Sequence, residues 1–186
     1  ELAHEDYLSC FETLYPYADY FTINISSPNT PGLRGLQEKE PLIKLLSAIR
    51  VANSKKAIPR PVLVKIAPDL DDLQLAEIKN IIIEQCMDGL IMGNTTLDRS
   101  NLNTSSAILD QIGPGGLSGL PVFEKSNNRL SALSALPGAI PLVGVGGILD
   151  SKSAQEKLSR GASLVQVYTG FIFTGPGIVK KICNAF

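Results

Sequence analysis

Two glycine-containing turns near the C-terminus have the composition of a phosphate-binding site. In the segment VGVGGI, Gly144, Gly146 and Gly147 let backbone N–H groups approach an anion closely, because no Cβ stands in the way. A second turn begins at Tyr168 and Thr169 and continues through FIFTGPG. A tight strand-to-helix turn that binds nothing would use the same residues, but the two turns together favour phosphate binding.

Lys65 interrupts an otherwise apolar segment, PVLVKIA. A buried ammonium without a partner is costly, so this lysine must be paired or lose its proton. Lys65 has three possible partners. They are Asp69 in a structural ion pair, a carbonyl substrate that forms a Schiff base, and the electron-rich edge of a cofactor.

Two polar clusters follow apolar segments and could bind a neutral ring that carries amide groups. Asn24 and Asn29 belong to the cluster NISSPNTPG, and Asn94 and Thr95 belong to GNTT. Together they offer paired hydrogen-bond donors and acceptors. Such residues are also ordinary in turns, but two similar clusters at strand ends favour a binding role.

The chain alternates short apolar segments with segments of helical periodicity. Strands are predicted at 20–25, 61–67, 89–92, 140–145 and 164–168, and helices at 4–15, 41–52, 71–86, 123–136, 151–160 and 177–185. Ser151 is the predicted N-cap of its helix and Gly161 its C′ residue. The stretch 97–121 is rich in Asn, Ser and Gly and is predicted to be a long functional or mobile loop.

This alternation predicts an α/β fold with a parallel sheet, either doubly wound or a barrel. Phosphate sites of TIM barrels commonly form after strands seven and eight, which is where the two glycine turns would fall. The sequence therefore predicts a TIM (β/α)8 barrel, present here as a partial barrel of strands about four to eight. Residues 1–186 would be the C-terminal portion of one domain, with the first strands upstream.

Composition and charge exclude several other functions. The net charge is −1, from 17 Lys and Arg against 18 Asp and Glu, so a nucleic-acid partner is not expected. His4 is the single histidine, which removes Ser-His-Asp, Cys-His and poly-His metal chemistry. The three cysteines are far apart and lack metal-ligand spacing, so no metal site is predicted. No apolar run approaches the ~18–20 residues of a membrane span, and a targeting signal is not expected in this chain.

Six motifs together resemble one enzyme family along nearly the whole chain. NISSPNTPGLRGLQ, VKIAPD, NTTLDRS, GGLSG, VGVGGI and GASLVQVYTGFIF occur in this order. They resemble dihydroorotate dehydrogenase of the class 2, quinone-linked type. Serine within SSPN, where class 1 enzymes carry cysteine, indicates class 2.

The resemblance implies a reaction and a set of substrate residues. Ser27 would be the base that removes the C5 proton of dihydroorotate while C6 passes a hydride to FMN, yielding orotate in pyrimidine biosynthesis. The segment 28–35 would be a lid that excludes solvent. The residues implied to hold the pyrimidine ring are Asn24, Asn29, Asn94 and Thr95.

The resemblance also implies FMN as the cofactor. Lys65 would lie beside the N1–C2 carbonyl edge of the flavin. The other implied FMN-binding residues are Asn24, Gly93, Gly119, Gly146, Gly147, Tyr168 and Thr169. One position departs from the family pattern, because Gly93 stands where the family usually has threonine, so a flavin-contacting side chain is absent.

The remaining expectations concern regions outside these motifs. A membrane-docking segment that admits quinone would lie upstream, with peripheral association at the inner (cytoplasmic or mitochondrial) membrane. Arg34 could contribute to the lid, but the favoured interpretation is a solvated loop charge. Two alternatives remain: a Schiff-base aldolase or lyase that uses Lys65, and an isolated partial barrel that binds phosphate weakly or not at all.

Overall fold

The computed structural model describes residues 3–100 and 102–186 and contains a five-stranded parallel sheet. Its strands follow chain order across the sheet, and each is parallel to its neighbour. They are β1 (Phe21–Asn24), β2 (Val62–Ile66), β3 (Gly89–Met92), β4 (Leu142–Val145) and β5 (Leu164–Gln166). A doubly wound sheet would reverse its strand order at a switch point. The uninterrupted order is that of a barrel wall, which confirms the predicted fold class.

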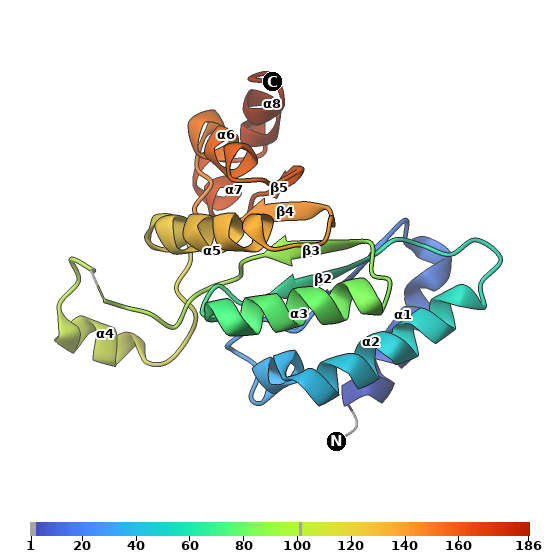
Figure 1. Ribbon diagram of the computed structural model, residues 1–186. Coiled ribbons are helices and arrows are strands. Elements are labelled where there is room, and N and C mark those ends of the chain that lie inside the picture. The colour runs from blue at the N-terminus through green and yellow to red at the C-terminus, as the bar shows by residue number, and fades with distance from the viewer. Residues whose placement is uncertain (1–2, 101) are drawn as a thin grey trace.

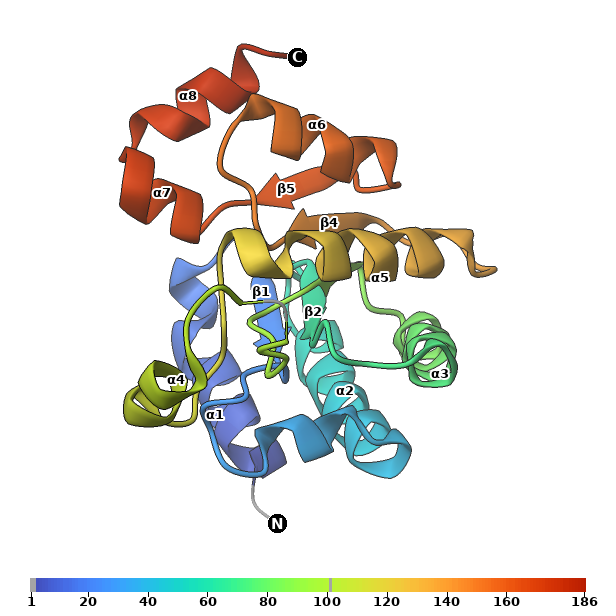
Figure 2. The ribbon, with the colours of Figure 1, turned by 90° about the vertical axis from the view of Figure 1, so that its left-hand side faces the viewer.

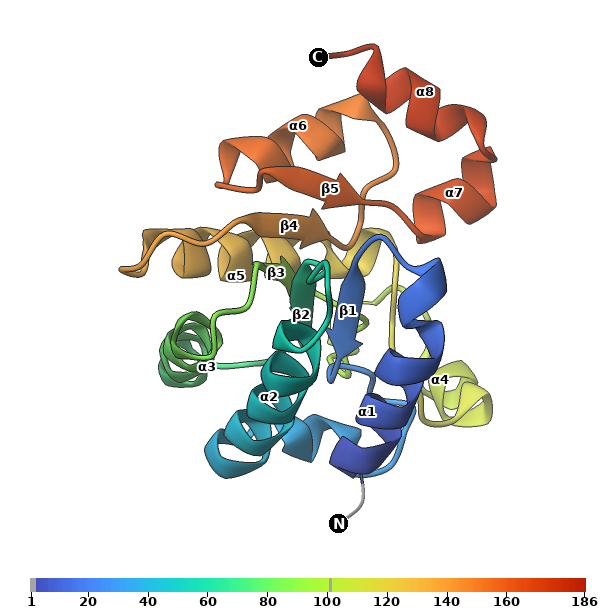
Figure 3. The same cartoon turned by 90° about the vertical axis from the view of Figure 1, so that its right-hand side faces the viewer.

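Helices cover one side of this wall. Figure 3 shows α2 (Lys39–Ser54), α3 (Asp72–Glu84), α5 (Phe123–Ala135) and α6 (Ser151–Ser159) on the same side of the strands. Each packs against the next, and α1 (Ala3–Leu14) packs against α2. Two short helices, α7 (Thr169–Thr174) and α8 (Gly177–Cys183), end the chain. The 3-10 helices are η1 (Tyr15–Tyr17), η2 (Leu33–Gln37) and η3 (Leu120–Val122).

Alternation along β2 separates the core from the site. Val62, Val64 and Ile66 are buried in the large cluster between sheet and helices. Successive strand residues point to opposite faces, so Leu63 and Lys65 face the other way. Leu63 packs there in a smaller apolar cluster with Ile91, Val143 and Val145. The sequence suggested burial on both faces, but at β2 the face opposite the helices is only half-buried.

Three local expectations were wrong. The predicted loop 97–121 contains a helix, α4 (Ser106–Ile112), and an antiparallel bridge between Thr96 and Leu117. Figure 1 shows this excursion reaching beyond the carboxyl edge of the sheet. The N-cap of α6 is Asp150 rather than Ser151, because the Asp150 carboxylate accepts from Ser153 N at 2.8 Å. The segment after β5, expected to be a turn, is helical as α7.

Helix ends elsewhere agree with the sequence patterns. Asp71 caps α3 by accepting from Gln74 N at 2.8 Å, and Gly161 follows α6 with φ +100°. Among the residues described, none of the helices has both the length and the apolar character needed to cross a membrane.

Candidate active site

One cavity of about 370 Å³ lies at the carboxyl ends of all five strands. Figure 2 looks onto this edge of the sheet. Parallel strands present their carboxyl ends at the same edge, so residues far apart in the sequence meet there. Most predicted site residues line the cavity: Asn24, Asn29, Lys65, Asn94, Thr95, Gly119, Gly146, Gly147, Tyr168 and Thr169. Ser27, Gly93 and Gly144 lie outside the lining, and Gly144 instead packs against Lys157 and Ala162. The two amide clusters, Lys65 and the glycine turns therefore meet at one rim, while Ser27 lies beside it.

A buried serine links the two asparagine clusters. Ser26 is fully buried, and its hydroxyl donates to Asn24 Oδ1 at 2.7 Å and accepts from Asn94 Nδ2 at 2.8 Å. From α1, Tyr7 donates its hydroxyl to Asn24 O at 2.7 Å. The two amide side chains are thus held in fixed orientations at the ends of β1 and β3. Sequence reasoning did not single out Ser26, although it stands beside Ser27 in the SSPN motif.

Ser27 is half-buried and outside the cavity lining. Its Oγ accepts a hydrogen bond from Asn29 N at 3.3 Å. Asn29 in turn accepts from Gly116 N at 3.1 Å, which joins this loop to the α4 excursion. A Cβ at Gly116 would collide with the Thr95 side chain, so only glycine permits this approach. Ser27 therefore lies in a segment braced by a neighbouring loop rather than by the sheet.

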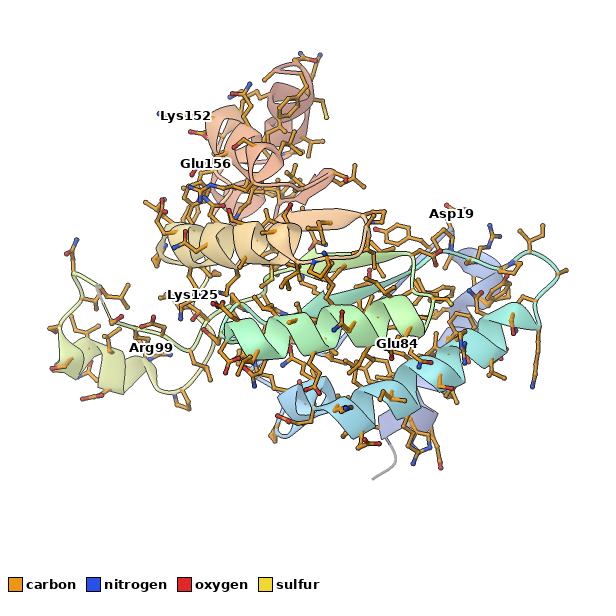
Figure 4. All side chains as sticks on the ribbon, viewed as in Figure 1. Asp19, Glu84, Arg99, Lys125, Lys152 and Glu156 are labelled. Atoms are coloured by element: carbon orange, nitrogen blue, oxygen red, sulfur yellow. The ribbon has the colours of Figure 1, made fainter. Side chains whose placement is uncertain are left out.

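Two further contacts hold the excursion in shape. Thr96 and Leu117 exchange backbone hydrogen bonds of 3.0 and 2.8 Å. Arg99, labelled in Figure 4, donates to Gly115 O at 3.0 Å across the excursion. Among the described residues, Thr95 Oγ1 is buried without a hydrogen-bond partner while Thr95 lines the cavity. A ligand that enters the cavity could supply the missing partner of this hydroxyl.

Lys65 lies on the cavity side of β2, half-buried, and donates to Gln166 Oε1 at 3.2 Å. Burial lowers the pKa of Lys65 below its ordinary value. The ion pair with Asp69, one of the partners considered, is absent from the described residues, because Asp69 pairs with Arg34 at 2.9 Å and Lys125 at 3.0 Å. Gln166 was not predicted. The sequence could have indicated Gln166, because its amide interrupts the otherwise apolar strand segment LVQVY.

The glycine turns form a backbone-lined end of the cavity. Gly119, Gly146 and Gly147 have φ of +77°, +103° and +72°, where side chains are strained. A Cβ at Gly147 would lie 2.5 Å from Phe123 Cβ, and one at Gly119 would lie 3.2 Å from Thr169 Cγ2. The turn after β4 therefore packs closely against the start of α5, and the Gly119 turn packs against Thr169. Exposed backbone donors in such a cradle suit a phosphate group.

A buried cation lies behind the Gly146 turn. Lys157 is fully buried and donates to Ser126 Oγ, which lies 3.3 Å from Gly146 O. Burial lowers the pKa of Lys157 to about 8. The Lys157 Nζ also lies 5.1 Å from the centre of the Phe123 ring. Lys157 was not predicted, because the same helix carries an exposed lysine, Lys152, and the sequence does not distinguish the two.

Gly93 is buried at the end of β3 but outside the cavity lining. Its φ is +117°, and a Cβ there would lie 2.8 Å from Val145 O. The backbone of this chain therefore excludes a side chain at the position where the resembling family usually carries threonine. Its implied contact with FMN stays a prediction.

The interpretation of Arg34 as a solvated charge was wrong. The Arg34 guanidinium donates to Ser26 O at 3.0 Å, Asp69 Oδ2 at 2.9 Å and Thr95 O at 2.9 Å. Its position within a turn-rich segment gave no indication of these partners, which come from three separate strand ends.

The cavity combines features that suit a ring system with a phosphate tail. Oriented amides and an unsatisfied hydroxyl lie at one part of the rim, a half-buried lysine stands on the floor, and glycine turns form the end near β4 and β5. Such a set can bind a planar heterocycle through its carbonyl and N–H groups and a phosphate through backbone amides.

Comparisons with known proteins agree on one family. A family profile described as dihydroorotate dehydrogenase matches residues 2–186. The chain is 48% identical over 183 residues to a dihydroorotate dehydrogenase (quinone) of Christiangramia forsetii, covering 98% of this chain and 53% of the relative. It is 49% identical over 189 residues to one of Edwardsiella ictaluri, covering 99% and 55%.

A solved structure has the same fold. The structure of DHODH in complex with ferulenol from Eimeria tenella superposes with a TM-score of 0.88 at 30% identity. The superposition covers 97% of this chain and 52% of the other. The chain thus spans about half the length of the relatives that it matches.

Proposed function

The chain belongs to the dihydroorotate dehydrogenase family, and we propose that it takes part in the oxidation of dihydroorotate to orotate in pyrimidine biosynthesis. The observation that supports this most is the single cavity at the carboxyl ends of the five strands, where both amide clusters, Lys65 and the glycine turns meet. We further propose that residues 1–186 form the C-terminal portion of one FMN-binding barrel domain.

The cavity fits FMN in its residue types. Backbone groups of Gly119, Gly146 and Gly147, with the hydroxyl of Thr169, would hold the phosphate, since all four residues line the same end of the cavity. Lys65 would stand beside the ring system, where its charge favours electron-rich oxygens. When bound, FMN supplies the acceptor for the hydride that leaves the substrate.

The substrate would lie against the amide clusters. Asn24 and Asn94 would present oriented donors and acceptors to the ring carbonyl and N–H groups, and Thr95 Oγ1 would gain the partner that it lacks. Because Ser26 fixes both amides before any ligand arrives, little ordering is needed on binding. Asn29 and Tyr168 lie at the rim of the same cavity and would border the bound ligands.

Ser27 is the proposed base for the C5 proton. Serine is a weak base at its ordinary pKa, so its surroundings must accept the proton onward and exclude bulk solvent. The segment 28–35 would serve as the lid, and its bracing by Gly116 through Asn29 would limit how far it opens. The Ser27 hydroxyl would exchange its bond from Asn29 N for the substrate.

The acceptor and the location are also part of the proposal. The relatives named above are quinone-linked, and we propose a quinone as the final electron acceptor here. Peripheral association with the inner membrane would bring the protein to that acceptor. The Schiff-base alternative is not favoured by the family, and borohydride trapping of a substrate adduct on Lys65 would distinguish it.

The direct test uses the intact protein encoded by the gene, purified under anaerobic conditions. We expect a yellow protein whose flavin absorbance bleaches on addition of dihydroorotate, with one orotate formed per flavin. A quinone should then restore the absorbance. A protein that neither contains nor takes up FMN, or whose flavin dihydroorotate leaves unchanged, would overturn the proposal.

A further inference from the structure

Arg34 contributes no atoms to the cavity lining, yet its guanidinium connects the loops that do. Nε donates to Ser26 O at 3.0 Å, Nη1 to Asp69 Oδ2 at 2.9 Å, and Nη2 to Thr95 O at 2.9 Å. Only 22% of the side chain is exposed. All three guanidinium nitrogens are therefore used, each toward a different strand end.

Two of these partners adjoin the proposed chemistry. Ser26 O belongs to the peptide bond whose nitrogen is that of Ser27, so the bond from Arg34 fixes the plane of that peptide. Thr95 is the residue after Asn94, and the side-chain amide of Asn94 donates a hydrogen bond to the Ser26 hydroxyl. One rigid group thus sets the Ser27 peptide relative to Asn94 and Thr95, across the ends of β1 and β3.

The third partner supplies the anchor. Asp69 follows β2 and also accepts from Lys125 Nζ at 3.0 Å, from Leu97 N at 3.2 Å and from Thr96 Oγ1. Lys125 belongs to α5, and Figure 4 shows it between α5 and the start of α3. Through Asp69, Arg34 is therefore linked to the loop after β3 and, by Lys125, to the helix α5.

We infer that Arg34 is a positioning residue that holds Ser27 in register with the substrate-binding amides. The inference rests on the proposed function. Arginine suits the task because its planar fork donates in three fixed directions at once, whereas a lysine ammonium carries the same charge without that geometry. A misplacement of about 1 Å at a reacting group can cost roughly 100-fold in rate.

The test compares Arg34→Lys and Arg34→Ala in the intact, FMN-loaded protein by anaerobic stopped flow. We expect the rate of flavin reduction at saturating dihydroorotate to fall about 100-fold in Arg34→Ala and at least about 10-fold in Arg34→Lys. FMN content and the rate of flavin reoxidation by quinone should stay within about twofold of wild type. Added guanidinium should partly restore reduction in Arg34→Ala, and methylammonium should not.

Arg129→Ala is the matched control. Arg129 pairs with Asp72 at 2.7 Å and donates to Leu70 O at 3.2 Å, and its side chain is 27% exposed, but it lies outside the cavity lining. It should reduce flavin at the wild-type rate.

Two results overturn the inference. One is wild-type reduction rates in both Arg34 variants. The other is an equal loss of reduction, FMN content and reoxidation in Arg34→Lys, which would indicate a structural role only. If Arg34→Ala does not retain FMN, Arg34→Lys decides alone. If dihydroorotate does not reduce the flavin of the wild-type protein, the proposed function itself is wrong. That result can be told apart from the two outcomes above, because it concerns the wild type and not the Arg34 variants.

Discussion

Ser26 and Ser27 are adjacent in the sequence but differ in what surrounds their hydroxyls. The Ser26 hydroxyl is buried and bonded to two asparagine side chains, which commits its proton to Asn24. The Ser27 hydroxyl is half-buried and accepts one backbone hydrogen bond. An uncommitted hydroxyl on a loop is the better candidate for proton removal, and the committed one is the better support for the amides.

Replacing Ser27 with alanine tests this division of roles. Ser27→Ala should slow flavin reduction by dihydroorotate by about 10²–10⁴-fold, the usual contribution of a positioned acid or base. Stopped-flow absorbance under anaerobic conditions measures the rate. Ser9→Ala removes an exposed hydroxyl from α1, outside the cavity lining, and should leave the rate unchanged. Equal rates in Ser27→Ala and wild type would remove Ser27 from the mechanism.

Lys65 shows how one residue type can support different functions until its surroundings are known. Burial lowers its pKa, which a Schiff-base lysine requires, whereas a lysine that acts by its charge beside a cofactor must keep its proton. Its bond to Gln166 places the ammonium over the floor of the cavity, on the face shared with Leu63 and Val145. Together with the family, this favours the cofactor-facing role in the proposal.

The glycine turns determine how closely the strand ends approach the neighbouring helices. At Gly147 a positive φ coincides with contact against Phe123 at the start of α5. The turn after β4 can therefore lie against α5 only without a side chain. The same packing keeps the phosphate cradle open toward the cavity.

Two alanine substitutions distinguish the cost of a positive φ from the cost of a collision between the added Cβ and a neighbouring residue. Gly147→Ala should lower the free energy of unfolding by more than the roughly 1–2 kcal/mol that a left-handed residue costs alone, and should reduce FMN content. Gly113→Ala has a similar φ, +77°, with nothing within 4 Å of the added Cβ. Gly113→Ala should lower the free energy of unfolding only by the cost of the backbone strain and should retain FMN. Calorimetry and flavin absorbance measure both, and equal losses in the two variants would contradict the cradle.

At the scale of the whole molecule, Asp69 joins parts of the chain that are distant in sequence. It binds Arg34 after β1, Thr96 and Leu97 after β3, and Lys125 on α5. Burial acts to raise the pKa of Asp69, but the hydrogen bonds from Thr96, Lys125 and Arg34 together lower it below its ordinary value. The carboxylate thus stays charged within the network.

This network predicts a pH-dependent stability. Because the folded pKa of Asp69 is lowered, its contribution is fully present above the ordinary carboxyl pKa and is lost as pH falls through the lower, folded value. Asp69→Asn should therefore reduce the free energy of unfolding by about 1–3 kcal/mol at pH 7. The difference from wild type should shrink below about pH 3.9.

Urea denaturation at pH 7, 5 and 3 measures this difference. The control is Asp72→Asn, which removes a carboxylate that is 78% exposed and paired with Arg129. It should change stability by no more than about 0.5 kcal/mol, as expected for an exposed pair. A pH-independent effect of Asp69→Asn would show that shape, and not charge, matters at this position.

Much of the fold follows from local sequence patterns. The apolar segments became the five strands, the amphipathic segments became helices with ends close to those predicted, and the order of the glycine turns indicated a barrel. These features depend on residues near one another in the chain, whose spacing directly sets secondary structure. The helix α4 was missed because its seven residues bury none of their side chains, so no apolar face marks it.

The order of residues along the chain specifies which residue types stand at the strand ends, and hence the amides, the lysine and the glycines of the rim. The partners of these side chains depend on the folded arrangement. Lys65 meets Gln166, 101 positions away, instead of the nearby Asp69, and Arg34 reaches three strand ends instead of solvent. Such pairings depend on strand register and on which face each side chain occupies, which local spacing does not specify.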